Sequence, residues 1–166
     1  MKDYKDNHLL TRGLPGYDYL CVMETMQQAE QELIADFELF ESWEEKYHYI
    51  IELGQKLPPL DACYKTDDYK IKGCQSSVWL HAESKDGRVY FNADSDSTFV
   101  KGEIALLIRV LSGRTPVEIK SAQLGFVESI GLKQHMAVTR ANGLAAMVKQ
   151  MKIYALGYST EVKPTE

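Results

Sequence analysis

The sequence predicts one α+β domain, with helices packed on one face of a small antiparallel sheet. Helical periodicity fills both ends of the chain, and only residues 76–93 alternate between apolar and polar side chains. Within that stretch Lys85-Asp86-Gly87 separates two alternating runs, which is typical of a tight hairpin and therefore of antiparallel strands. The length of 166 residues and an apolar content of 45% suit one domain with a sizeable core.

Two helices are expected at the N-terminal end. The first is predicted over residues 23–40, because its apolar side chains recur at spacings of three and four. These side chains are Met26, Ala29, Leu33, Phe37 and Phe40. The second is predicted to begin after Ser42, which forms a capping box with Glu45, and to end near Leu57, since the prolines that follow cannot continue a helix.

The sheet is expected in the middle of the chain. Strands are predicted over residues 76–83 and 88–93, with Gly87 taking the positive φ that the turn requires. A third short strand over residues 69–72 would support them, because two strands alone are marginally stable.

Helices are expected again after the sheet. Residues 99–111 are apolar almost all round and predict a buried helix. A capping box over residues 115–118 starts a short helix, another covers residues 126–130, and the last runs over 140–155 and ends at Gly157. Core packing is expected from Trp79, Phe99, Leu106, Leu107 and Ile108.

These elements divide the chain into an N-terminal extension (1–22), one domain (23–158) and a C-terminal tail (159–166). The net charge of −5 argues against binding to nucleic acid or an anionic membrane. The acidic residues that are dense between Glu24 and Asp68 predict a solvated face. The chain shows no membrane span or export leader, and its three cysteines fit a reducing compartment, so a cytoplasmic location is expected.

Cys74 is the residue that most clearly suggests chemistry. It lies where a loop becomes a strand, after Gly73, which leaves the backbone free, and before the polar residues Gln75, Ser76 and Ser77. A thiol on a loop against a rigid sheet suits sulfur chemistry better than core filling.

The segment Gly73-Cys74-Gln75-Ser76-Ser77-Val78-Trp79 resembles the cysteine motif of the SufE family, the sulfur-acceptor proteins of iron–sulfur cluster assembly. The resemblance covers roughly residues 26–157 in the family's order. Its other matching segments are Tyr47 to Gly54, Leu57-Pro58, Asp94-Ser95-Asp96, Val100-Lys101-Gly102, Leu111 to Pro116, Gly131-Leu132 and Arg140 to Leu144. It implies a SufE/IscU-like fold.

The resemblance also implies roles for individual residues. Cys74 would carry a persulfide, and Arg140, at the start of the final helix, would lie near it and favour its thiolate, as Lys72 would from two residues away. Asp96 would tether the cysteine loop at rest, or else cap the buried helix. Gly73 and Gln75 would shape the loop, and the resting sulfur would be partly covered by apolar side chains.

The partners implied are a cysteine desulfurase, SufS-like or CsdA-like, and an iron–sulfur scaffold complex, SufBCD-like. The protein would be an accessory sulfur carrier and not an enzyme, a monomer or weak dimer, without a metal or cofactor of its own. Pyridoxal phosphate would belong to the desulfurase. SufE and its relative CsdE are not distinguished.

Two other functions start from the same residues. A cysteine-nucleophile enzyme of acyl-transfer type needs a base, and the candidates are His48, His81 and His135. A cluster-binding scaffold needs about three cysteine ligands or a mixture with histidine. Cys21 lies in the extension. Cys63 lies in the irregular link over residues 60–72, where it is expected to be incidental or to pair with Cys74 under oxidation.

Overall fold

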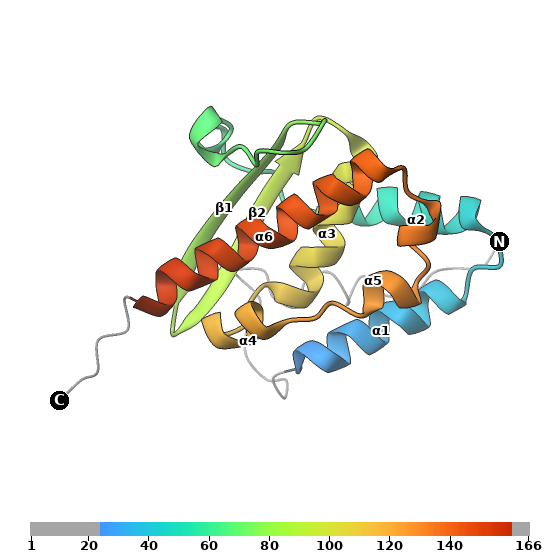
Figure 1. The fold of residues 1–166 in the computed structure, drawn as a ribbon, viewed down its shortest axis with the longest axis horizontal. Helices are drawn as coiled ribbons and strands as arrows, with labels where there is room; N and C mark the ends of the chain where they lie inside the picture. Colours follow the sequence, from blue (N-terminus) through green and yellow to red (C-terminus); the bar gives the residue numbers. More distant parts are fainter. Residues whose placement is uncertain (1–23, 161–166) are drawn as a thin grey trace.

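A β-hairpin lies along one side of the molecule and α-helices pack against it (Figure 1). The computed structural model describes residues 24–160. Strands β1 (Val78–Lys85) and β2 (Arg88–Ser95) pair antiparallel, with Leu80 opposite Ala93. The two turn residues, Asp86 and Gly87, have φ values of 52° and 74°, as the predicted tight hairpin requires.

One face of the hairpin is buried and the other is partly exposed. The buried face carries the side chains of Val78, Leu80, Ala82, Val89, Phe91 and Ala93. Trp79 lies on the opposite face and is half-buried, so its assignment to the core was wrong. An alternating strand sends neighbouring residues to opposite faces, and Trp79 follows Val78 directly.

Other segments cover both edges of this short sheet. On the edge of β1, the carbonyl of Val78 accepts from the Ile71 amide at 2.8 Å, and Tyr154 and Tyr158 donate their hydroxyls to the next two edge carbonyls, at 3.0 and 2.7 Å. On the edge of β2, Val89 exchanges backbone hydrogen bonds with the segment that follows α3. The expected third strand over residues 69–72 is reduced to a single bridge, and these contacts take its place.

Six α-helices are present between residues 24 and 160: α1 (Met26–Glu38), α2 (Trp43–Gln55), α3 (Thr98–Leu111), α4 (Pro116–Ser121), α5 (Phe126–Ser129) and α6 (Val138–Thr160). Three single turns of 3₁₀-helix, at Ala62–Tyr64, Asp67–Tyr69 and Lys133–His135, lie in the links. The α+β class with helices packed on a small antiparallel sheet is confirmed.

The capping signals in the sequence place most helix starts correctly. Ser42 and Thr115 both form the expected capping boxes, and α3 starts after Ser97, whose hydroxyl accepts from the Val100 amide. The last helix is longer at both ends than predicted, because it starts at Val138 and continues through Gly157. A helical glycine costs only about 1 kcal/mol relative to alanine, which the hydrogen bond of Tyr158 to β1 can offset.

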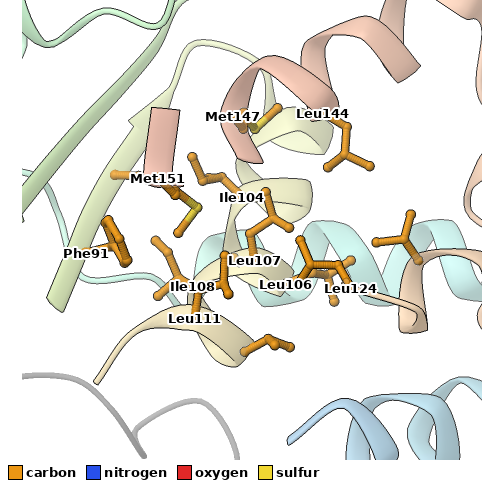
Figure 2. Close-up of a cluster of buried hydrophobic side chains, with 14 of the residues drawn as sticks. Phe91, Ile104, Leu106, Leu107, Ile108, Leu111, Leu124, Leu144, Met147 and Met151 are labelled. Atoms are coloured by element: carbon orange, nitrogen blue, oxygen red, sulfur yellow. The ribbon is translucent and has the colours of Figure 1, made fainter. Parts of the chain in front are cut away.

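Helix α3 forms the centre of the core. Figure 2 shows its aliphatic side chains meeting Leu144, Met147 and Met151 of α6 and Phe91 of β2. On another side α3 crosses α2 closely, because a Cβ built on Gly54 would lie 2.6 Å from the backbone nitrogen of Gly102. Only glycines allow these two backbones to come so near.

The acidic N-terminal region is not simply the solvated face that its composition predicts. Arg109, buried on α3, donates to both carboxylate oxygens of Glu24, at 2.7 and 2.8 Å, and to Glu32 at 2.7 Å. These carboxylates neutralise a cation in the core, so part of the acidic cluster is structural. Between residues 24 and 160 no helix is long and apolar enough to cross a membrane.

The predicted extension (1–22) and Cys21 lie outside the described residues, as does the tail from residue 161 onward.

Candidate functional site

Cys74 lies on the loop that leads into β1 and rests against the first turns of α6. Its side chain is half-buried, and Sγ lies 3.5 Å from the carbonyl oxygen of Gly143, to which the thiol donates. The φ of Gly73 is +94°, a conformation that side chains resist, and a Cβ there would touch Ala146 at 3.6 Å. The expected folded-back, partly covered thiol is what the structure shows.

Asp96 fixes the C-terminal end of the cysteine loop. Its Oδ1 accepts from the Ser77 amide at 3.0 Å, and its own amide donates to the Ser77 carbonyl at 3.2 Å. Ser95 adds a hydroxyl donation to the same carbonyl at 2.9 Å. Asp96 therefore ties down the residue three places after Cys74, while the helix cap that was its alternative role belongs to Ser97.

The electrostatics around Cys74 oppose the thiolate. Burial raises the pKa of the thiol, and the negative charge of Glu103 raises it further. Lys72 is exposed and does not contribute to this shift. The expectation that nearby cations favour the thiolate is wrong for this arrangement, because the charge that acts on the sulfur is negative.

Arg140 acts on Glu103 and is not among the groups that shift the pKa of the Cys74 thiol. Its guanidinium carbon sits 4.9 Å from the centre of the Phe99 ring, on α3, in a cation–π contact. Its positive charge opposes the effect of burial on Glu103, one helical turn after Phe99. Arg140 and Cys74 therefore both interact with the charge of Glu103. The expected proximity of Arg140 to the thiol stays a prediction.

Glu103 is the site residue that the sequence analysis missed. Its side chain is buried, at 1% exposure, and Oε1 has no hydrogen-bond partner in the described part of the chain. Burial raises the pKa of Glu103 to about 7. A charged residue inside a helix predicted to be apolar all round was the signal that could have found it.

The remaining candidates lie elsewhere or at the margin. Gln75 is exposed on the loop. Cys63 is exposed, its amide donating to Asp61 at 3.0 Å, and the Asp61 carboxylate helps raise the pKa of the Cys63 thiol, after a larger effect of desolvation. The pairing of Cys63 with Cys74 under oxidation stays a prediction.

Each candidate histidine contacts an aromatic ring. His81 stacks on Tyr64 at 3.8 Å, and His135 stacks on Trp43 at 4.1 Å. His48 is exposed and meets the edge of the Tyr47 ring. None of them is among the groups that shift the pKa of Cys74. Over residues 24–160, no three His, Cys, Asp or Glu side chains gather as metal ligands would.

An open groove of about 650 Å³ runs along the other side of α6. It is lined by Leu144, Val148 and Leu156 of the helix and by side chains between α4 and α5, with lysines at its rim. Gly143 and Ala146, which contact the cysteine loop, lie on roughly the opposite side of the α6 axis from these residues. The groove is therefore not part of the thiol site.

Comparison with known proteins identifies the family of this arrangement. A family model described as "SufE: Fe-S metabolism associated domain" matches residues 31–155. An uncharacterized SufE-like protein of Rhizobium meliloti is 37% identical over 131 residues, which are 76% of this chain and 94% of that protein. The SufE-like protein 1, chloroplastic/mitochondrial, of Arabidopsis thaliana is 38% identical over 152 residues, which are 91% of this chain but 40% of that protein.

A solved structure has the same fold. The solution structure of a hypothetical protein from Thermus thermophilus superposes with a TM-score of 0.67 over 80% of this chain and 97% of that one, at 21% identity. The fold and the site define a small α+β domain whose cysteine loop is held against its last helix. The chain belongs to the SufE family, whose domain is associated with iron–sulfur metabolism.

Proposed function

We propose that this protein is a sulfur acceptor, which takes persulfide sulfur from a cysteine desulfurase onto Cys74 and passes it to an iron–sulfur scaffold. The observation that carries the proposal is the position of the thiol. It lies within the family's motif, on a loop before β1, with one hydrogen bond to the carbonyl of Gly143. A sulfur held this lightly can leave α6 without breaking the core.

The proposed reaction is an exchange between a thiol and a persulfide. The Cys74 thiolate attacks the outer sulfur of the donor persulfide, a new S–S bond forms at Sγ, and the donor's own S–S bond breaks. The donor cysteine leaves as a thiolate with the electron pair, and the proton of Cys74 passes to solvent. No external oxidant or reductant is needed, because the sulfane sulfur keeps its oxidation state.

The site favours a carrier over a complete enzyme. Within residues 24–160, the Cys74 thiol donates to a carbonyl and the groups that shift its pKa include a buried carboxylate and no histidine, so the described residues supply no imidazole base for the acyl-transfer alternative. We therefore propose an accessory role in which the desulfurase brings the pyridoxal phosphate. Stripping the persulfide from that enzyme would speed its turnover. A cytoplasmic setting and a monomeric or weakly dimeric state complete the proposal.

The proposal is tested by mass spectrometry after the protein is mixed with a SufS-like desulfurase and cysteine. Cys74 is expected to gain one sulfur atom, about 32 Da, in a form that a small thiol removes. The Cys74→Ser variant should lose both the adduct and the stimulation of the desulfurase. Cys63→Ser is the matched control, since that thiol is exposed outside the motif, and it should keep both. A Cys74→Ser variant that still accepts sulfur at the normal rate would refute the proposal.

A further inference from the structure

Glu103 is a buried carboxyl group whose charge is only partly compensated, because Arg140 opposes the effect of burial on its pKa without cancelling it. It is 1% exposed, and its Oε1 accepts no hydrogen bond within residues 24–160. Buried polar atoms are nearly always paired, because an unpaired one costs roughly 1–3 kcal/mol, and more when it is charged. A carboxylate kept in this position therefore calls for an explanation.

The groups around Glu103 connect it to the cysteine loop. Glu103 follows Phe99 by four residues, so both lie on one face of α3. Arg140, on α6, lies over the Phe99 ring, and Gly143, one turn later, holds the Cys74 sulfur. The titratable and charged groups that act at this junction are the thiol from the loop and the guanidinium from α6. From α2, Tyr47 stacks on Phe99 at 4.5 Å.

Two like charges cannot both form easily in this half-buried space. The pKa of Glu103 is raised to about 7 by burial, and the pKa of Cys74 is raised by burial and then by Glu103. Ionising one of two coupled acids makes ionising the other more costly. Because the carboxyl group is the stronger acid, the negative charge that the pair takes up as the pH rises through about 7 belongs to Glu103 and not to the thiol.

We propose that Glu103 is a positioning residue for Cys74, whose buried carboxylate holds the thiol protonated and unreactive while the loop lies on α6. When the loop moves toward a partner, the thiol leaves both the apolar cover and the negative charge, and it then ionises into solvent. The benefit of this restraint rests on the proposed function, because a sulfur carrier must react with its donor and not with other electrophiles. The restraint itself is a property of the thiol and can be measured without any partner.

The experiment measures alkylation of Cys74 by iodoacetamide between pH 5.5 and 10. It uses the full chain carrying Cys21→Ser and Cys63→Ser, so that one thiol reacts, with and without Glu103→Gln. Near pH 8 the Glu103→Gln protein should react about three to ten times faster. The ratio of the two rates should approach one below pH 6, where Glu103 is largely protonated, and should fall again at the upper end of the range as the Cys74 thiol itself ionises in both proteins.

The pH dependence of that ratio separates the restraint from a change in packing. A loosened loop would raise the rate by the same factor at every pH below the ionisation of the thiol, including below pH 6, and such a result would overturn the proposal, as would equal or slower alkylation of Glu103→Gln. Glu30→Gln is the matched control, because burial also raises the pKa of that carboxyl group but it lies on α1 beside Phe126. This variant should alkylate like the parent, and faster alkylation would also count against the proposal.

The alkylation profile does not depend on sulfur transfer, so an absent persulfide on Cys74 would refute the proposed function while leaving the restraint intact.

Discussion

Helix α3 buries two charged side chains, Glu103 and Arg109, and the structure pairs the second much more completely than the first. Arg109 is 5% exposed and donates to both Glu24 and Glu32. Burial alone would raise the pKa of Glu24, but Arg109 outweighs burial and lowers it. Glu103 is buried more completely, and its Oε1 has no partner within the described chain.

The difference separates a structural charge from a functional one. Arg109 and its carboxylates neutralise each other, so the group at this end of α3 is held in one ionisation state. Glu103 has a pKa of about 7, so small changes around it alter its charge. The partly compensated charge of Glu103 acts on the Cys74 thiol, whereas Arg109 binds its carboxylates where α1 packs on α3.

The largest expected effect is the loss of stability when Arg109, the neutralised charge on α3, is replaced. Arg109→Met removes the buried cation that binds Glu24 and Glu32, leaving Glu24 with Arg114 at 3.5 Å, and should lower the free energy of unfolding by about 3–5 kcal/mol in urea denaturation. Combining it with Glu24→Gln and Glu32→Gln should recover much of that loss. A triple variant as unstable as Arg109→Met would mean that packing of the long side chain matters more than charge.

The next effect is the pH dependence of stability that the titration of Glu103 produces. Folding raises the pKa of Glu103 from 4.5 to about 7, so between these values the native state binds more protons than the unfolded chain. Its contribution to stability therefore falls as pH rises through this window, by up to about 3 kcal/mol, and changes little above it.

Glu103→Gln removes this titration. Relative to the parent, the variant should become more stable by up to about 3 kcal/mol as the pH is raised from 4.5 to 8. Chemical denaturation at several pH values checks it. A constant difference between the two proteins across that range would show that Glu103 ionises in the folded protein as it does in the unfolded chain.

A smaller effect is expected for Arg140, whose guanidinium acts on Glu103. Arg140→Ala should slow sulfur acceptance from the desulfurase about tenfold to a hundredfold, because a charge-assisted contact in the complex is worth roughly 1.5–3 kcal/mol. Arg140 is exposed, so the free energy of unfolding should change by less than about 1 kcal/mol. Full activity with unchanged stability would leave Arg140 with only its packing on Phe99.

The smallest effect is expected for a hydrogen bond between uncharged groups, which serves as a reference for the charged pairs. Tyr154→Phe removes the hydroxyl that donates to the Leu80 carbonyl at 3.0 Å, on the edge of β1. The expected loss is about 1 kcal/mol of unfolding free energy, as for an ordinary hydrogen bond. A loss as large as that of Arg109→Met would mean that the sheet edge, and not the buried cation, limits stability.

Local features of the sequence were sufficient for most of the fold. Ser42 with Glu45, and Thr115 with Glu118, start helices through contacts three residues apart, and Asp86-Gly87 turns the hairpin by its own backbone preference. Such signals are complete within a short window, so a single sequence reveals them.

The contacts that were missed join distant parts of the chain. Arg109 and Glu24 are 85 residues apart, and Tyr154 and Leu80 are 74 apart, so no local pattern connects them. The position of Cys74 followed from the family motif, but the sign of its pKa shift did not, because that depends on Glu103 of a helix that the sequence marks only as buried. Ionisation in a site depends on tertiary packing.

The close crossing of α2 and α3 has a consequence for rotation. Gly102 presses on the backbone of α2 near Ile50, so α3 cannot turn about its own axis without a collision. Glu103 follows directly, about 100° further round the helix. The glycine contact therefore fixes the rotation of α3, and with it the position from which the charge of Glu103 acts on the Cys74 thiol.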